Sequence, residues 1–385
     1  MKKLLFPFFI LWVLSGTAQY NNSWIDYSKT YYKFKVSKNG LVRISQPALN
    51  AIGLGASPAE QFQLWRNGEE VRLFTSVNTG PMGSNDYIEF WGRMNDGIPD
   101  KPLYRITDNQ LCDSFSLHTD TATYFLTASA TSPHLRYTNA ANNIAANTLA
   151  PDLYFMRRVE QPYRQMYNRG YSNLVGQYVY SSSYEAGEGW TTNDIAPGNP
   201  LSQVFTGLNV YPAGPANSLS LYIATAGNAS FARNLQVKVN NTLLIDTAMN
   251  NFAVIKAQLN SLPLSYFQNT DNLKVTVAGN STNANDRIVV GTIAITYPAQ
   301  FNFNNQKNFN FELKAAAAGN FLVIDNFNTG GVPPVLYSLN DGKRYSGDIT
   351  VAGKVRFALP PSPDPARKFM LVNQEANNTS TVGSF

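Results

Sequence analysis

Short segments in which apolar and polar residues alternate recur along most of the chain. In residues 32–36, Tyr32, Phe34 and Val36 point to one side of an extended strand and the two lysines point to the other. The dipeptides Asn39-Gly40 and Asn67-Gly68 stand between such segments and predict tight hairpins. Alternating or fully apolar runs predict further strands at residues 41–45, 63–66, 86–92, 122–129, 219–225, 234–241, 272–279, 286–298, 301–315, 319–327, 334–347 and 354–360.

This pattern predicts a mainly β chain built from several consecutive antiparallel β-domains, with few short helices. Leu235, Val237 and Val239 share one face of their strand, and Asn and Gly clusters separate the neighbouring strands as in a sandwich or jelly roll. The predicted organisation is an N-terminal β-domain at 19–150, a jelly-roll-like β-sandwich at 151–300, a small Ig-like β-domain at 301–372, and a linker at 373–385.

Helical signals are weak. Residues 47–54 predict one or two helical turns, because Pro47 stands at the start and glycines at the end. Residues 153–167 are partly helical or extended, since Pro162 argues against one long helix. Residues 137–150 carry no charge and no clear period, and we interpret them as a loop or linker.

The first eighteen residues predict an export signal. Lys2 and Lys3 precede an apolar run at 4–14, and small residues allow cleavage after Ala18. The apolar run is shorter than an ordinary membrane span. We therefore expect a protein exported through a cleavable signal peptide to the periplasm, the cell surface or the medium.

Composition narrows the functional classes. The formal net charge is +5, and two of these charges leave with the signal; no basic run suggests nucleic-acid binding. The single cysteine excludes an internal disulfide, and one cysteine with two histidines fits no zinc pattern. Gly53 and Gly55 do not lie between a predicted strand and a helix, as the glycines of a dinucleotide-binding site do. We expect no cofactor and assign no metal ligand.

Cys112 and His118 raise the question of a catalytic dyad. On an extended strand their separation is roughly 20 Å, well beyond hydrogen-bond reach. His134 comes closer only through a hairpin, and no nucleophile-elbow or oxyanion signal lies nearby. We interpret Cys112 as a buried structural thiol and assign no catalytic residue.

Acidic residues offer two further candidates. Asp96 and Asp100 flank Gly97, with Asp86 upstream, and could hold calcium, although the spacing fits no EF-hand and a structured turn is favoured. Glu185 and Glu188 precede Trp190, and paired carboxylates beside aromatics are typical of glycoside hydrolysis, although a loop that packs the tryptophan onto a sheet is favoured.

Exposed aromatic side chains on a β-sandwich can also stack on carbohydrate. The candidates are scattered rather than grouped on one strand, and core packing is their commoner use. They are Trp24, Trp65, Trp91 and Trp190.

Four ordered stretches resemble the N-terminal region of the gingipain-like cysteine peptidases of Bacteroidetes, closest to sortase-like members of the type IX secretion system. They are YYKFKVSKNGLVRIS, FQLWRNGEEV, DYIEFWGRMNDGIPDKPLYR and LHTDTATYFLT, with GEGW and IAITYP following in the expected order. The resemblance implies β-rich segments first, then a caspase-like α/β catalytic domain, then a sorting domain. Phe385 falls where the family's linker toward the catalytic domain is expected, and no residue matches the family's catalytic motifs.

The resemblance implies a non-catalytic N-terminal segment that scaffolds the catalytic domain or docks a substrate. The expected partners are a catalytic domain beyond this sequence, secretion-system proteins or protein substrates. The alternatives are a stand-alone surface module that binds glycan or protein, and a hydrolase that uses Glu185 or Glu188. Asp-Thr-Ala triplets at Thr121 and Thr247 resemble the O-glycosylation acceptor of exported Bacteroidetes proteins.

Overall fold

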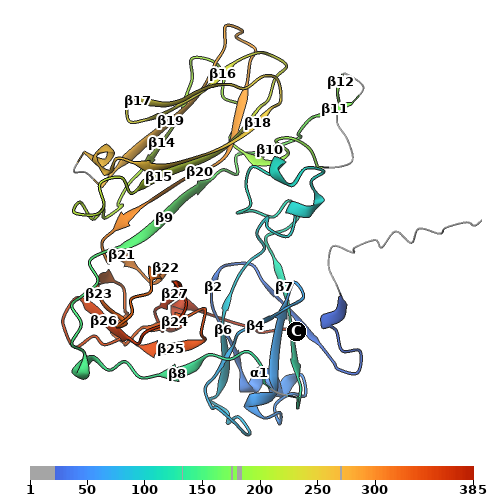
Figure 1. Cartoon of the computed structure of the whole chain (residues 1–385). Helices are drawn as coiled ribbons and strands as arrows, with labels where there is room; N and C mark the ends of the chain where they lie inside the picture. Colours follow the sequence, from blue (N-terminus) through green and yellow to red (C-terminus); the bar gives the residue numbers. More distant parts are fainter. Residues whose placement is uncertain (1–21, 132, 175–176, 180–183, 269–270) are drawn as a thin grey trace, which may run out of the picture.

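The computed structural model describes residues 22–131, 133–174, 177–179, 184–268 and 271–385, and it consists of strands arranged in three units (Figure 1). The prediction of a mainly β chain with several antiparallel sheets is confirmed. The described residues include one α-helix, α1 (Gln46–Ala51), whose first turn is capped by the Ser45 hydroxyl. The predicted signal peptide at 1–18 lies outside the described residues. The short 3₁₀ segments are η1 (Asn22–Trp24), η2 (Ala59–Gln61), η3 (Lys101–Leu103), η4 (Thr107–Asn109), η5 (Ile144–Ala146), η6 (Leu264–Phe267) and η7 (Ala376–Asn378).

The N-terminal unit, blue and cyan in Figure 1, packs two four-stranded sheets face to face. The alternation seen in the sequence explains its core, because Phe34, Phe62, Phe90 and Tyr124 all point between the sheets. One sheet has the order β1 (Tyr32–Val36), β7 (Ala122–Ala128), β3 (Phe62–Arg66), β4 (Glu69–Val71). The other has the order β28 (Thr379–Thr381), β2 (Gly40–Ser45), β6 (Tyr87–Gly92), β5 (Phe74–Thr75).

The two predicted hairpins have different outcomes. Asn67 and Gly68 have φ of 51° and 80° between the paired strands β3 and β4, as a tight hairpin requires. The hairpin at Asn39-Gly40 is wrong, because β1 and β2 belong to different sheets. The Asn39 side chain accepts a hydrogen bond from the Met94 backbone N–H at 2.8 Å. The turn therefore carries the chain across the core instead of pairing its flanking strands.

The middle unit is a sandwich of two four-stranded sheets at the top of Figure 1. Leu235, Val237 and Val239 are fully buried, as their alternation predicts. Residues 155–162 form a strand rather than helix, with Pro162 at its last position. One sheet has the order β18 (Val254–Leu262), β15 (Leu219–Gly227), β20 (Ile288–Ala299), β9 (Phe155–Pro162). The other has the order β14 (Leu201–Phe205), β19 (Leu273–Asn280), β16 (Asn234–Val239), β17 (Thr242–Ala248), and two short pairs join β10 (Met166–Asn168) to β13 (Gly189–Thr191) and β11 (Ser172–Leu174) to β12 (Gln177–Val179).

The C-terminal unit is a second, smaller sandwich, red and orange in Figure 1. Its aromatic residues Phe303, Phe309 and Phe311 contact Phe155 of β9, so its core is continuous with that of the middle unit. One sheet has the order β21 (Asn302–Gln306), β23 (Asn320–Phe327), β26 (Lys354–Leu359). The other has the order β22 (Asn308–Lys314), β27 (Ala366–Val372), β24 (Val335–Ser338), β25 (Lys343–Ser346), β8 (Thr138–Ala140).

Two segments expected to connect units are instead parts of sheets. β8, inside the predicted loop 137–150, pairs in parallel with β25. β28, inside the predicted linker 373–385, pairs in parallel with β2, and the Phe385 ring lies 5.6 Å from that of Phe34. The N-terminal unit is thus completed by the last described residues. The predicted domain division stays a prediction, with this difference at its end.

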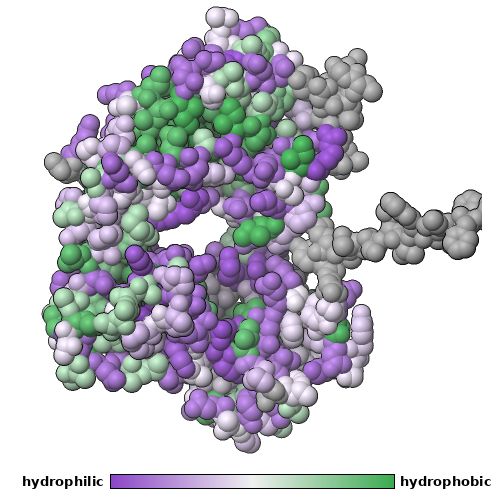
Figure 2. All heavy atoms as spheres, in the orientation of Figure 1, coloured by the Kyte–Doolittle hydropathy of each residue, from purple (hydrophilic) through white to green (hydrophobic). Residues whose placement is uncertain are grey.

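The three units enclose an opening. Figure 2 shows it between the upper unit and the two lower ones. Each lower unit reaches the upper one by its own connection, through β9 on one side and residues 93–121 on the other. Among the described residues, no helix combines the length and apolar character needed to span a membrane.

Candidate functional site

Residues 93–121, between β6 and β7, leave the N-terminal unit and lie against the middle sandwich, near β10 in Figure 1. Leu111 packs there with Ala224, Ala226 and Val289. Gly291 permits this contact, because a Cβ built on it would lie 2.4 Å from the Leu111 Cβ. This segment therefore brings the acidic, aromatic, Cys and His candidates of the sequence to one junction.

Asp96 closes a turn within that segment, and Asp100 joins its two ends. Asp96 Oδ1 accepts a hydrogen bond from the Ile98 N–H at 3.2 Å, and Asp100 Oδ2 accepts one from the Leu117 N–H at 2.8 Å. A Cβ on Gly97 would lie 2.6 Å from the Phe115 carbonyl oxygen, so the turn requires glycine. In the described part of the chain no group of three or more His, Cys, Asp or Glu is placed to hold a metal. These contacts support the structured-turn interpretation.

Glu185 and Glu188 both form contacts at this junction. Glu185 is 3% exposed and forms an ion pair with Arg105 at 2.9 Å. The Glu188 carboxylate accepts the Glu185 N–H at 3.1 Å, and the Tyr104 hydroxyl donates to the Glu188 carbonyl oxygen at 2.6 Å. Burial raises the pKa of Glu188 above its usual value. We call Tyr104, Arg105, Glu185 and Glu188 the junction cluster.

Trp190 packs beside the junction cluster and contacts residues 93–121. Its indole N–H donates to the Ser116 carbonyl oxygen at 3.1 Å, and the Arg164 guanidinium carbon lies 4.6 Å from its ring centroid. Arg164 also pairs with Asp120 at 2.8 Å. Trp190 therefore joins residues 93–121 to the middle sandwich, in agreement with the packing role favoured from the sequence.

Cys112 and His118 make separate contacts within the described structure. The thiol is 6% exposed, and burial raises its pKa to about 11. His118 Nε2 lies 3.4 Å from the Tyr184 hydroxyl oxygen. A raised pKa keeps the thiol protonated at neutral pH, whereas a nucleophilic cysteine needs a lowered pKa.

We expect the native Cys112 thiol to react slowly with 5,5′-dithiobis(2-nitrobenzoate) at pH 8. A pKa of about 11 instead of 9.0 cuts the thiolate fraction roughly a hundredfold, and burial slows access further. The rate in the native chain is compared with that in urea, and Cys112→Ser provides the blank. Equal native and unfolded rates would contradict the buried-thiol assignment.

A second buried cluster, which the sequence did not indicate, lies between the N-terminal and C-terminal units. Glu89 of β6 is 0% exposed and pairs with Arg43 at 2.7 Å and with Arg344 at 3.4 Å. The buried Tyr337 hydroxyl donates to the same carboxylate, and burial raises the pKa of this tyrosine well above its usual value. We call Arg43, Glu89, Tyr337 and Arg344 the Glu89 hub. One sign of this cluster was present in the sequence: Glu89 is a charged residue in a strand whose other positions are apolar.

The four candidate tryptophans lie on four different elements, as expected, but two of them are in contact. Trp24 of η1 lies 5.4 Å from Trp65 and 5.4 Å from Phe125, measured between ring centroids. Trp65 and Phe125 are paired across β3 and β7, so they share the outer face of that sheet. Trp91 instead packs between the N-terminal and C-terminal units. Of the two Asp-Thr-Ala threonines, Thr247 is exposed and Thr121 half-buried; their modification stays a prediction.

Comparison with known proteins found a solved structure with a similar fold. No family model matches the sequence, and no curated protein matches it. The crystal structure of dimeric latent PorU from Porphyromonas gingivalis matches 91% of this chain with a TM-score of 0.52 at 12% identity. Two other structures each match 36% of the chain with a TM-score of 0.22, too low to show a common fold. They are the carbohydrate-binding module CBM36 in complex with calcium and xylotriose, at 9% identity, and the CBM36-1 domain of a multidomain xylanase from the hindgut metagenome of Trinervitermes trinervoides, at 7% identity.

The likeness to PorU concerns the fold alone, given the low identity. It extends over nearly the whole of this chain but over only 32% of the PorU chain. This chain therefore corresponds in fold to about a third of the PorU chain.

Proposed function

We propose that this chain is the non-catalytic, β-rich part of an exported gingipain-like cysteine peptidase, of the sortase-like type linked to type IX secretion. Its role is to scaffold a catalytic domain or to dock a substrate. The observation that carries the proposal is the PorU-like arrangement over 91% of the chain. The four ordered sequence stretches that resemble the family support it independently.

The internal contacts suit a scaffold. The Glu89 hub and β28 join the N-terminal unit to the C-terminal end of the chain, and the junction cluster joins it to the middle sandwich. Each connection contains buried polar groups that are hydrogen-bonded, an arrangement that fixes geometry. A frame of this kind holds an attached domain or substrate in a defined orientation.

The proposal predicts that the purified exported chain has no thiol-protease activity. A fluorogenic peptide library is incubated with the native chain, with Cys112→Ala, and with papain as a positive control. Equal background rates for the native chain and the variant are expected, because the buried Cys112 thiol stays protonated. Cleavage that Cys112→Ala abolishes would overturn the non-catalytic assignment.

The place of the chain in a longer protein is tested in its gene. An open frame beyond the codon for Phe385 that encodes an α/β domain with His and Cys supports the proposal. A stop codon there favours the alternative, a stand-alone surface module for glycan or protein.

One observation favours that alternative: the contact of Trp24, Trp65 and Phe125 on the outer face of a sheet. A glycan array, followed by titration of tryptophan fluorescence, distinguishes the two. Absence of any glycan signal counts against a sugar-binding role.

A further inference from the structure

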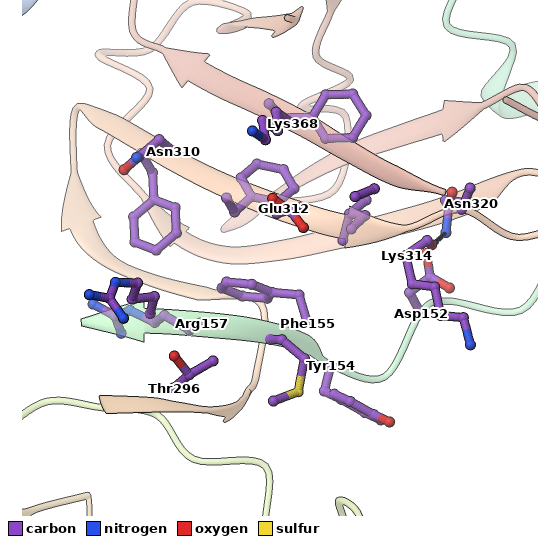
Figure 3. Close-up of a pocket in the computed structure, with 18 of the residues that line it drawn as sticks. Asp152, Tyr154, Phe155, Arg157, Thr296, Asn310, Glu312, Lys314, Asn320 and Lys368 are labelled. Atoms are coloured by element: carbon purple, nitrogen blue, oxygen red, sulfur yellow. Dashed lines mark hydrogen bonds between the residues drawn. The ribbon is translucent and has the colours of Figure 1, made fainter. Parts of the chain in front are cut away.

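The hollow in Figure 3, of about 1220 Å³, lies where β9 meets β22. The ring of Phe155 on β9 packs there against those of Phe309 and Phe311 on β22. The lining of this hollow mixes four basic with three acidic side chains. Its charge therefore matches no single class of ligand.

A smaller pocket, of about 750 Å³, opens at one end of the middle sandwich. One wall comes from residues 210–217, in the loop between β14 and β15, and the other from residues 263–267, which include η6. The Leu264 N–H donates to the Ala216 carbonyl oxygen at 2.7 Å and so joins the two walls. The pocket is thus part of the folded chain, and its volume is in the range of small-ligand sites.

Most of the pocket surface is apolar. Val210, Leu264 and Phe267 are buried at its base, and the exposed rings of Pro212 and Pro263 stand at its sides. Since Phe267 is only 2% exposed, its ring is not presented for a sugar to stack on. The pocket therefore favours a ligand with an aliphatic part.

Two polar side chains are held at the pocket by one backbone unit. The Val210 N–H donates to Asp271 Oδ1 at 3.1 Å, and Gln300 Nε2 donates to the Val210 carbonyl oxygen at 3.0 Å. Within the described residues, Asp271 Oδ2 and Gln300 Oε1 accept no hydrogen bond, and Asp271 forms no ion pair. These two oxygens are thus oriented acceptors without a donor, an arrangement that lowers the entropy cost of binding one.

The charge of the pocket favours a cationic ligand. Among the described residues that line it, Asp271 is the only charged one. The Ser265 hydroxyl and the Asn217 amide supply further acceptors. A primary ammonium group carries one positive charge and three N–H donors, and its methylene stem packs well on apolar walls.

We propose that this pocket binds a primary ammonium group on an aliphatic stem, with Asp271 and Gln300 as acceptors and Pro212 and Pro263 beside the stem. The ammonium group belongs either to a lysine side chain of a polypeptide or to a free small amine. The inference depends only on the geometry of this pocket, so its failure would leave the proposed place in a peptidase unaffected.

The test uses saturation-transfer difference NMR to measure the affinity of the exported chain for two probes of equal length. Pentan-1-amine carries the ammonium group, and pentan-1-ol replaces it with a hydroxyl. We expect the amine to bind at least about fivefold more tightly, because charge-assisted hydrogen bonds are stronger than neutral ones. Equal affinities for the two probes, or no binding of the amine, would overturn the proposal.

A third probe, Nα-acetyl-lysine N-methylamide, identifies the source of the ammonium group. An affinity close to that of pentan-1-amine supports the pocket as a site for lysine side chains of polypeptides. Binding of pentan-1-amine alone supports it as a site for free amines.

A matched pair of variants locates the ammonium group. Asp271→Asn removes the charge but keeps an oxygen for the Val210 N–H, and it is expected to weaken amine binding at least about fivefold. Asp246→Asn removes an exposed carboxylate of β17 outside the pocket and is expected to bind within about twofold of the native chain. Melting curves establish that both variants fold; should Asp271→Asn unfold, the comparison of amine and alcohol on the native chain still decides. Native affinity in a folded Asp271→Asn variant would overturn the assignment to this pocket.

Discussion

Replacing Glu89 by alanine is expected to destabilise the chain by about 3–5 kcal/mol, the usual cost of removing one partner from a buried charge cluster. The Glu89 carboxylate is fully buried and is shared by two arginines and the Tyr337 hydroxyl. Its loss leaves Arg43, Arg344 and the tyrosine hydroxyl without their common acceptor. Because the hub lies between two units, the effect should concentrate at their contact.

The measurement combines thermal melting with hydrogen–deuterium exchange of peptides from β2, β6 and β24. We expect a lower Tm and faster exchange in these strands, with the middle sandwich little changed. Asp325→Ala is the matched control, since it breaks an exposed ion pair with Lys354 and should cost about 0–1 kcal/mol. A Tm for Glu89→Ala that matches this control would show that the hub does not hold the units together.

The second large effect is expected at Arg233, inside the middle sandwich. Its side chain is 0% exposed and that of Asp286 is 1% exposed, and the two pair at 2.5 Å. The same guanidinium donates to the carbonyl oxygens of Met249, Asn251 and Ala229. Together with the pairing to Asp286, these bonds connect the loops after β15, β17 and β19. We expect Arg233→Ala to cost about 3–5 kcal/mol, because it leaves a buried carboxylate uncompensated.

Two further variants separate charge from geometry at this site. Arg233→Lys keeps the charge but lacks the planar fork that reaches several acceptors, so it should recover only part of the stability. The double variant Arg233→Met with Asp286→Leu removes both charges and should be less damaging than Arg233→Ala. In Arg233→Ala, hydrogen–deuterium exchange should become faster in residues 229–233, 249–251 and 283–286. If the double variant proved the most damaging of the three, the uncompensated charge would not be the cause.

The sequence predicted most of the strands because their alternation is local. Asn67-Gly68 forms its hairpin because the two strands it joins are also partners in space. Asn39-Gly40 carries the same local signal, yet β1 pairs with β7, far along the chain. The three-residue strands β8 and β28 have no period of their own and depend on the edges of β25 and β2. A local sequence pattern therefore cannot predict which strands pair with each other.

The candidate residues show the same limit. Two separate stretches of sequence supply the junction. Leu111 and the acidic turn at 96–100 belong to one, and Glu185 and Trp190 belong to the other. They meet only because residues 93–121 dock on the middle sandwich. Glu89 was visible as a polar residue in an apolar strand, but its partners come from β2, β24 and β25. The chemistry of each residue could be read from the sequence, whereas its neighbours could not.

The parallel pairing of β28 with β2 has a consequence for the order of events during biosynthesis. The ribosome releases Leu41 early and Thr379 late, yet the two residues face each other across one ladder. Until residues 379–385 have been synthesised, one edge of β2 lacks its partner strand, and the space beside Phe34 that Phe385 fills stays open to other chains. A nascent chain that stalls before these residues exposes a strand edge that can aggregate or bind a chaperone, and the sheet that contains β2 and β6 closes only after they have been made.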